Sequence, residues 1–217
     1  MKKILVAAAA ILFSGLIMTP TAQAAPVVSN GIAWSPNASY PGLPALPDKP
    51  FGDYCTMGWV GYGPGGDKVG LSAAHCVAGK PDGAPVYRWL PGTGGGRELI
   101  GHIGFRDNNV DWVVIRFVSN AIVTANGPAL RIDSIGVDNP AGNSCKDGQS
   151  TGVTCGQITG QNATRIFTTG YAFNGDSGGP LAQGNSIIGL TRGATQQGFE
   201  YVKIAPVLRW LNFQTAS

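Results

Sequence analysis

Charged residues are scarce in this chain of 217 residues: Asp, Glu, Lys and Arg make up 12%, and there are two His. Hydrophobic residues make up 43%, and turn formers are abundant, with 33 Gly and 15 Pro. A helical bundle normally carries more charge, and a disordered chain carries fewer hydrophobic residues. The composition therefore favours an all-β protein rich in turns, with room for one domain or two small packed barrels.

Long hydrophobic runs are also absent, except near the amino terminus. Residues 4–18 form an apolar run that is shorter than the roughly 20 residues that a membrane-spanning helix needs. Two lysines precede this run and an Ala-Gln-Ala sequence ends at Ala24, which is the pattern of a signal peptide. We predict that residues 1–24 are cleaved off, with cleavage after Ala25 as the alternative. The mature protein is then expected outside the cell, or in a periplasmic or cell-wall space, without a membrane anchor.

No charge of either sign predominates once this peptide is removed. Residues 1–24 contain two of the 15 basic residues and none of the 12 acidic ones, so the mature chain is nearly neutral. Nucleic-acid binding needs a basic surface, so we expect no nucleic-acid partner. The sequence also contains neither a dinucleotide-binding fingerprint nor a phosphate loop, and we expect no cofactor.

Cysteines number four, an even set that permits three pairings in an oxidising compartment. Their order along the chain favours two local bridges, Cys55–Cys76 and Cys145–Cys155. A zinc site is the alternative, but neither cysteine spacing is of the Cys-x-x-Cys kind and there are two histidines in all. We therefore expect two disulfides and no metal.

The chain after the signal peptide divides into three parts. Residues 25–53 are rich in proline and show little periodicity, so we expect them to lie over the surface or to be mobile. Short apolar runs between turn signals then predict two blocks of strands, at about 54–127 and 128–217. Pro206 opens a short predicted helix at 207–213. The expected strands are residues 55–62, 68–73, 85–90, 98–105, 110–117, 152–159, 165–169, 180–182, 186–191 and 199–204.

Three residues of the strand-rich part are candidates for nucleophilic catalysis. Ser177 lies in residues 175–181 (GDSGGPL), where glycines present a hydroxyl and nearby N–H groups on a tight turn. His75 follows an apolar strand and precedes a predicted disulfide cysteine. Asp111 precedes a strand too apolar for a solvated charge, with Asp107 as the alternative acid. Each residue alone is equally typical of an ordinary turn, but their order differs from the orders in subtilisin and the α/β-hydrolases and is that of chymotrypsin.

The segments around these three residues resemble a known family. Residues 71–76 (LSAAHC), 111–117 (DWVVIRF) and 175–180 (GDSGGP) are similar to the three signature segments of trypsin/chymotrypsin-like serine peptidases. Residues 150–156 and 188–191 are similar to the short bacterial, streptogrisin-like branch. The resemblance implies an all-β fold of two packed six-stranded antiparallel β-barrels, with the site in the cleft between them and the short C-terminal helix beside them.

The resemblance covers residues 54–217 and implies a role for each matching position. Ser177 would be the nucleophile, and His75 would act first as general base and then as general acid. Asp111 would hold the histidine tautomer and stabilise the imidazolium. The backbone N–H groups of Gly175 and Ser177 would form the oxyanion hole.

Two departures from the family concern the surroundings of the nucleophile. The mature amino terminus, residues 25–28, is not the Ile-Val-Gly-Gly type that animal members insert beside the acid before the serine. Asp176 therefore needs another cation, and Lys146 is nearest the position that bacterial members use, with a solvated loop lysine as the alternative. Tyr171 stands where trypsin-like members have an acid at the base of the specificity pocket, so cleavage after Arg or Lys is not predicted.

A third departure lies in residues 192–194, which match the strand that lines the substrate pocket. Arg192 stands where the family has a small serine bonded to the triad acid, and Gly193 and Ala194 follow it. We expect Arg192 either to pair with Asp111 and weaken its support of the histidine, or to bind an acidic substrate group. A surface arginine is the third interpretation.

The sequence as a whole predicts a secreted, monomeric serine endopeptidase that hydrolyses peptide or protein substrates through an acyl-enzyme. One alternative keeps the fold without turnover, as a pseudo-peptidase or binding module whose cleft is blocked by Arg192 and Tyr171. A second alternative is an esterase that uses the same triad, because acyl chemistry does not by itself select the leaving group.

Overall fold

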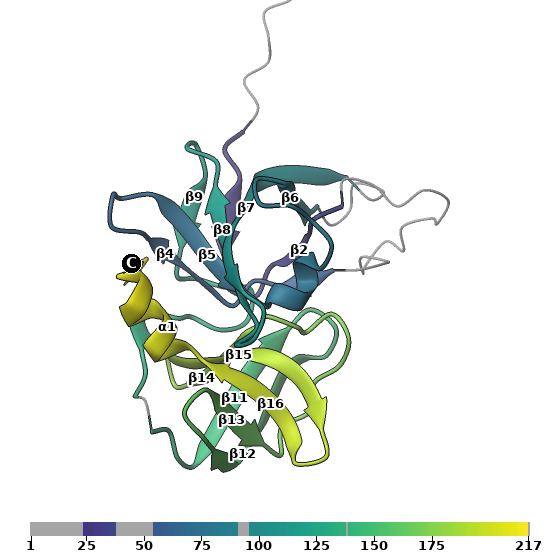
Figure 1. The fold of residues 1–217 in the computed structure, drawn as a ribbon, viewed down its shortest axis with the longest axis vertical. Helices are drawn as coiled ribbons and strands as arrows, with labels where there is room; N and C mark the ends of the chain where they lie inside the picture. Colours follow the sequence, from purple (N-terminus) through teal and green to yellow (C-terminus); the bar gives the residue numbers. More distant parts are fainter. Residues whose placement is uncertain (1–23, 38–53, 91–95, 138, 217) are drawn as a thin grey trace, which may run out of the picture.

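The computed structural model describes residues 24–37, 54–90, 96–137 and 139–216. The predicted signal peptide falls almost entirely outside these residues. In the described part of the chain, no helix is long and apolar enough to cross a membrane. Figure 1 shows two sheets packed one above the other, with α1 (Ile204–Leu211) beside their junction.

The first half of the chain, together with the C-terminal strand β17 (Gln214–Thr215), forms a strongly curled antiparallel sheet. It is built from short strands joined by tight turns, as the spacing of apolar runs and glycines predicts. The turn after β5 is a short 3₁₀ helix, η1 (Ala74–Val77). In sheet order the strands are β17 (Gln214–Thr215), β4 (Trp59–Tyr62), β5 (Lys68–Ser72), β8 (Trp112–Phe117), β7 (Arg97–Asp107), β6 (Pro85–Trp89), β2 (Ala33–Ser35) and β3 (Cys55–Thr56).

The second half forms a closed barrel of six strands, because β16, at one end of the sheet, also pairs with β15 near the other end. Two short parallel pairings lie outside this antiparallel pattern: β10 (Ser134–Ile135) with β15, and β1 (Val27–Ser29) with β9 (Ile122–Thr124). The barrel strands are, in order, β15 (Ser186–Thr195), β14 (Pro180–Gln183), β11 (Asn143–Gly148), β12 (Gly152–Gln161), β13 (Arg165–Thr168) and β16 (Gly198–Lys203).

The predicted all-β fold of two packed sheets is confirmed, but the first sheet is a curled half-barrel of eight strands and not the expected six-stranded barrel. Its end strands, β17 and β3, do not pair in the described part of the chain, and it includes part of the proline-rich segment. Strand β2 pairs with both β3 and β6, and Trp34 within it is 1% exposed. The prediction that residues 25–53 lie over the surface is therefore wrong for the described part of that segment. The physical reason is that β2 lies between two prolines, Pro26 and Pro36, and so keeps all its backbone donors.

The hydrophobic side chains fall into three clusters, and one of these joins the two halves. On β8, Val113 and Ile115 belong to the core of the first sheet. Trp112 and Val114, on the other face of the same strand, pack with residues of β15, β16 and α1. Because β8 is buried on both faces, its sequence is an almost continuous apolar run. Asp111, the residue just before β8, therefore lies at the junction of the two halves.

The C-terminal helix begins three residues earlier than predicted. Pro206 is its third residue, which a helix tolerates because the N–H groups of the first turn have no partner within the helix. Leu208 is buried and Leu211 is half-buried against the junction cluster. Trp210 lies on the outer side of the helix and is 67% exposed.

Candidate active site

The turn that carries Ser177 lies at the junction of the two halves and is fastened to both. The N–H of Thr56, on β3, donates to the carbonyl of Ser177 at 2.8 Å. The N–H of Gly178 donates to the carbonyl of Thr191, on β15, at 2.7 Å. Gly178 has a φ of +81°, which L side chains rarely adopt, and a Cβ there would overlap the Ser72 hydroxyl oxygen. The glycines around the serine are thus required by close packing as well as by turn geometry.

Two backbone N–H groups of this turn, those of Gly175 and Ser177, donate to no described residue. The other amides of the turn are used: Asp176 donates to the Phe173 carbonyl at 3.0 Å, and Gly179 donates to the Asp176 carbonyl at 2.9 Å. Gly175 has a φ of +96°, which a residue with a side chain would rarely adopt. The two amides predicted for the oxyanion hole are therefore the ones left open to a ligand.

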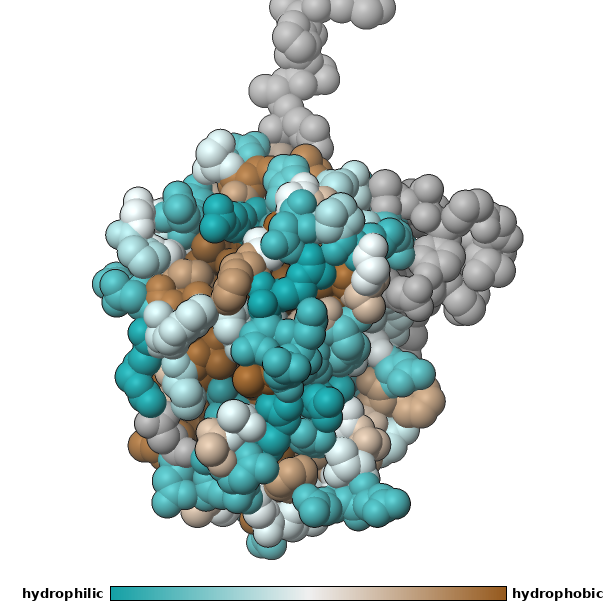
Figure 2. Space-filling view, viewed as in Figure 1, coloured by the Kyte–Doolittle hydropathy of each residue, from teal (hydrophilic) through white to brown (hydrophobic). Residues whose placement is uncertain are grey.

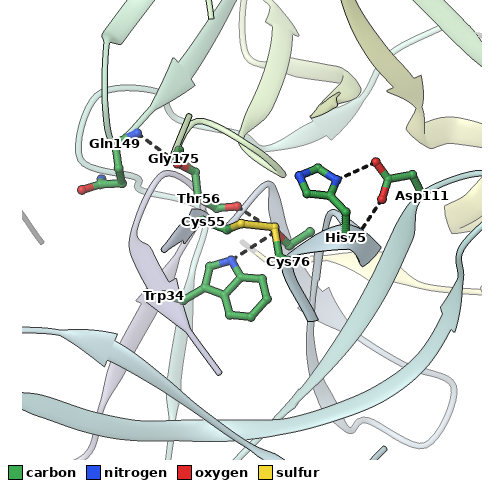
Figure 3. Close-up of a disulfide and its surroundings, with 9 residues drawn as sticks. Trp34, Cys55, Thr56, His75, Cys76, Asp111, Gln149 and Gly175 are labelled. Atoms are coloured by element: carbon green, nitrogen blue, oxygen red, sulfur yellow. Dashed lines mark hydrogen bonds and ion pairs between the residues drawn. A yellow bond between two sulfur atoms is a disulfide. The ribbon is translucent and has the colours of Figure 1, made fainter. Parts of the chain in front are cut away.

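His75 and Asp111 are joined by two hydrogen bonds, one through the ring and one through the backbone. The Nδ1 atom of His75 lies 2.8 Å from Oδ2 of Asp111, and the His75 backbone N–H donates to Oδ1 at 2.9 Å (Figure 3). Both oxygens of one carboxylate are thus engaged with one residue. These two bonds set the orientation of the His75 imidazole ring, with Nε2 directed away from Asp111.

Asp111 is buried, with 5% exposure, at the end of the β7–β8 hairpin. Its φ is +73°, a left-handed conformation that Asp tolerates better than most residues. Asp107, the alternative acid, has another role: its Oδ1 accepts the N–H groups of Asn109 at 2.8 Å and Val110 at 2.9 Å. Asp107 shapes the hairpin, and the hairpin presents Asp111 to His75.

Ser177 and His75 line one cavity of about 440 Å³, together with Gly175 and Tyr54. In Figure 3 the Asp111 carboxylate lies on one side of the imidazole ring and Gly175 lies on the other. The Ser177 hydroxyl makes no hydrogen bond with His75 or with any other described residue.

Asp176 and Lys146 form a fully buried ion pair directly behind the nucleophile. Lys146 Nζ lies 3.0 Å from Asp176 Oδ2, and both side chains are 0% exposed. Asp176 also accepts hydrogen bonds from the Thr151 hydroxyl at 2.6 Å and from the N–H groups of Ser150 and Phe173 at 2.8 and 2.9 Å. Burial raises the pKa of Asp176, but the hydrogen bonds from Thr151 and Phe173 and the charge of Lys146 outweigh it, so the pKa is lowered overall.

Arg192 lies at a β-bulge, where the register between β15 and β16 shifts between Thr191 and Gly193. A bulge turns the extra side chain toward one face of the sheet. Here it turns Arg192 toward two acids: Nε lies 3.4 Å from Asp111 Oδ2, and Nη1 donates to Glu200 Oε2 at 2.9 Å. Of the interpretations open at the sequence level, the structure shows the pairing with Asp111.

The residues predicted for the substrate pocket are only partly brought together. Arg192, Gly193 and Ala194 line a cavity of about 420 Å³ that also contains His75 and Asp111. Tyr171 lines neither described cavity that contains His75; it is 52% exposed, and its ring stacks on Phe173 with centroids 6.4 Å apart. The ring of Tyr171 therefore lies outside the lining of these two cavities.

Both expected disulfides are present, Cys55–Cys76 and Cys145–Cys155. The first ties η1 to β3 directly beside His75 (Figure 3). Cys55, His75 and Cys76 are close enough to hold a metal ion, but both sulfurs are in the disulfide and offer no thiolate.

Two residues of the site were missed in the sequence, Thr151 and Glu200. The Thr151 hydroxyl donates a hydrogen bond to Asp176. Glu200 accepts hydrogen bonds from Arg192 and from Arg165, the latter at 2.5 Å. Glu200 is 7% exposed in a strand. Its signal in the sequence is an acid inside the apolar run 199–204, where burial requires a cationic partner.

Comparison with known proteins gives the fold. No protein-family model and no curated protein matches the chain. Among solved structures, protease A of Thermobifida fusca has a TM-score of 0.64 at 21% identity, covering 88% of this chain and 99% of its own. A Nocardiopsis protease has a TM-score of 0.64 at 20% identity, covering 88% and 100%. A protease described as glutamic acid specific has a TM-score of 0.64 at 18% identity, covering 87% and 100%. The chain has the fold of these proteases, the chymotrypsin fold.

Proposed function

We propose that this chain is a secreted serine endopeptidase that cleaves peptide bonds through an acyl-enzyme. The observation that carries the proposal is the double contact between His75 and Asp111, facing a serine turn with two open N–H groups. Acyl transfer needs a nucleophile, an oriented base and oxyanion donors, and these residues could supply all three. The fold of bacterial serine proteases supports the same assignment.

In the proposed reaction, Oγ of Ser177 attacks the carbonyl carbon of the substrate while Nε2 of His75 takes its proton. The N–H of Nδ1 donates to Asp111, whose carboxylate stabilises the imidazolium. The negatively charged carbonyl oxygen accepts hydrogen bonds from the N–H groups of Gly175 and Ser177. The C–N bond then breaks, His75 gives its proton to the leaving amine, and water hydrolyses the ester in the same way.

Each buried contact behind the turn supports this chemistry by limiting motion of the nucleophile. Asp176 is held from four directions by Lys146, Thr151, Ser150 and Phe173. Since Asp176 lies between Gly175 and Ser177 in the chain, its anchoring fixes the two N–H groups relative to each other. A preorganised pair of donors loses little free energy to reorganisation during the reaction.

Protein and peptide substrates are favoured because the structural neighbours are proteases and the cavities around His75 are open at the surface. Secretion is favoured by the predicted signal peptide and the two disulfides. The second candidate function is a binding module, and the observation that favours it is Arg192, which competes with His75 for Asp111.

The test uses the mature chain and its Ser177→Ala variant, both treated with a biotinylated fluorophosphonate, with the adduct mapped by mass spectrometry. We expect labelling of the native chain at Ser177 and none of the variant. Hydrolysis of a peptide library should fall by about five to six powers of ten in the variant. Absence of labelling in folded, disulfide-bonded protein would favour the binding module, and turnover of esters without peptides would favour an esterase.

A further inference from the structure

A groove on the outer face of the molecule is lined by aromatic rings that the proposed reaction does not use. It has a volume of about 610 Å³ and lies between the β7–β8 hairpin and α1, with residues 163–164 as its third side. Figure 2 shows brown and pale residues gathered around α1, next to a mostly teal area. We call this cavity the aromatic groove.

Three rings form a mutual cluster in the aromatic groove. The centroids of Phe105 and Trp112 are 5.6 Å apart, those of Phe105 and Trp210 are 5.6 Å apart, and those of Trp112 and Trp210 are 5.8 Å apart. Trp112 is buried beneath the other two, whereas Phe105 is 50% and Trp210 is 67% exposed. A Trp exposed to this degree beside a cavity is typical of an interaction surface rather than of a folding core.

The charged groups of the aromatic groove are already engaged within the protein. Arg106 is paired with Asp82, and the Asp107 carboxylate caps the hairpin. Lys203 also has a partner. What remains for a ligand is ring surface together with the side-chain amides of Asn108 and Asn109, which make no hydrogen bond to described residues. Amides offer one donor group and one acceptor group, which match the polar groups of a peptide backbone.

The aromatic groove lies next to the candidate active site, because one residue lines both. Asn108 lines both the aromatic groove and the cavity that contains His75, Asp111 and Arg192. The hairpin turn that carries Asn108 also ends in Asp111, and Arg165 Nη2 holds this turn by donating to the Asn109 carbonyl at 3.2 Å. A polypeptide that leaves the active-site cavity over Asn108 therefore meets the aromatic rings next.

We propose that the aromatic groove is a remote binding site for the substrate polypeptide, which takes an uncharged segment with aromatic or large aliphatic side chains. This inference rests on the proposed peptidase function and names its substrate class: protein chains with an apolar segment at a distance from the cleaved bond. Short substrates that reach Ser177 without crossing Asn108 gain nothing from the groove.

The test compares casein with p-nitrophenyl acetate, a small ester that occupies the active site alone, in the native chain and the Trp210→Ala variant. We expect the variant to raise KM for casein about tenfold, the loss typical of one aromatic anchor, with kcat unchanged. Rates on the small ester should stay within a factor of about two. The matched control is Ile122→Ala, which removes another exposed apolar side chain, 53% exposed, on β9.

A second readout does not depend on turnover. Binding of fluorescein-labelled casein is measured by anisotropy for Ser177→Ala, alone and combined with Phe105→Ser or Trp210→Ala. Weaker binding in both double variants supports the groove even if Ser177 proves not to be a nucleophile. Unchanged binding overturns the proposal, and so does an equal loss of activity on casein and on the small ester, which would indicate a structural role for the rings.

Discussion

Nε of Arg192 lies 3.4 Å from Oδ2 of Asp111, the same oxygen that contacts the His75 ring at 2.8 Å. The candidate triad acid is therefore shared between a base that must gain positive charge during the reaction and a cation that carries it permanently. Arg192 also joins Asp111 to Glu200, both of which are nearly buried. Removing Arg192 should consequently affect rate and stability in opposite directions.

For Arg192→Met we expect kcat/KM on a small ester to rise about threefold to tenfold, because the imidazolium then has Asp111 to itself. We expect the free energy of unfolding to fall by about 1 kcal/mol, a small loss because the arginine side chain is 41% exposed. Arg192→Lys keeps the charge and is the control. The rate is expressed per molecule that the fluorophosphonate labels at Ser177. A slower rate for the Met variant would show that Arg192 assists Asp111 instead.

The buried pair Lys146–Asp176 should be far more important for stability than a surface pair. Lys146→Met leaves the Asp176 carboxylate buried without its cation, so we expect a loss of about 3–5 kcal/mol in urea unfolding. Fluorophosphonate labelling at Ser177 should fall with it, since Asp176 anchors the turn. Arg131→Met breaks an exposed pair with Asp133 and should change little. Equal effects of the two variants would contradict this ranking.

Asp147 should make stability decrease as pH rises, in contrast to Asp176. Burial raises the pKa of Asp147 above its ordinary value of 3.8, and its Oδ2 is buried without a hydrogen bond from any described residue. Ionising Asp147 therefore costs stability as the pH rises from 3.8 through the raised pKa. The lowered pKa of Asp176 has the reverse sign: its contribution is present above 3.8 and is lost as the pH falls below it.

Asp147→Asn removes the cost of ionisation and should stabilise the protein at pH 7 but not at pH 3. The measurement is the free energy of unfolding in urea across this range, for the native chain and the variant. An equal shift at every pH would mean that the change is one of packing and that the charge of Asp147 does not matter.

Gly178 and Gly142 offer a matched test of crowding at the nucleophile turn. Their φ values are nearly equal, +81° and +83°, but a Cβ at Gly142 meets nothing within 4 Å. Gly142→Ala should cost about 1–2 kcal/mol from backbone strain alone. Gly178→Ala should cost a further 1–3 kcal/mol and abolish labelling, because its Cβ would collide with Ser72. Stability is measured by thermal unfolding. Equal losses of stability in Gly142→Ala and Gly178→Ala would show that crowding by Ser72 does not matter.

Local patterns in the sequence were enough to predict most strands, the C-terminal helix and the cysteine pairs. Each of these depends on residues close together in the chain or on apolar alternation, which short segments carry by themselves. Strand β11 was missed because it is polar, with Lys146 and Asp147 buried in it. Periodicity does not identify a strand whose inward side chains are charged.

The sequence by itself determined the set of candidate residues, because their types, glycine neighbours and order define one kind of chemistry. Only the tertiary structure decided what surrounds them. It shows that Asp107 shapes the hairpin while Asp111 meets His75, that Arg192 turns inward at a bulge toward Glu200, and that the exposed rings gather beside α1. These relationships join residues far apart in the chain, and the register of strand pairing that brings them together is a property of the whole fold.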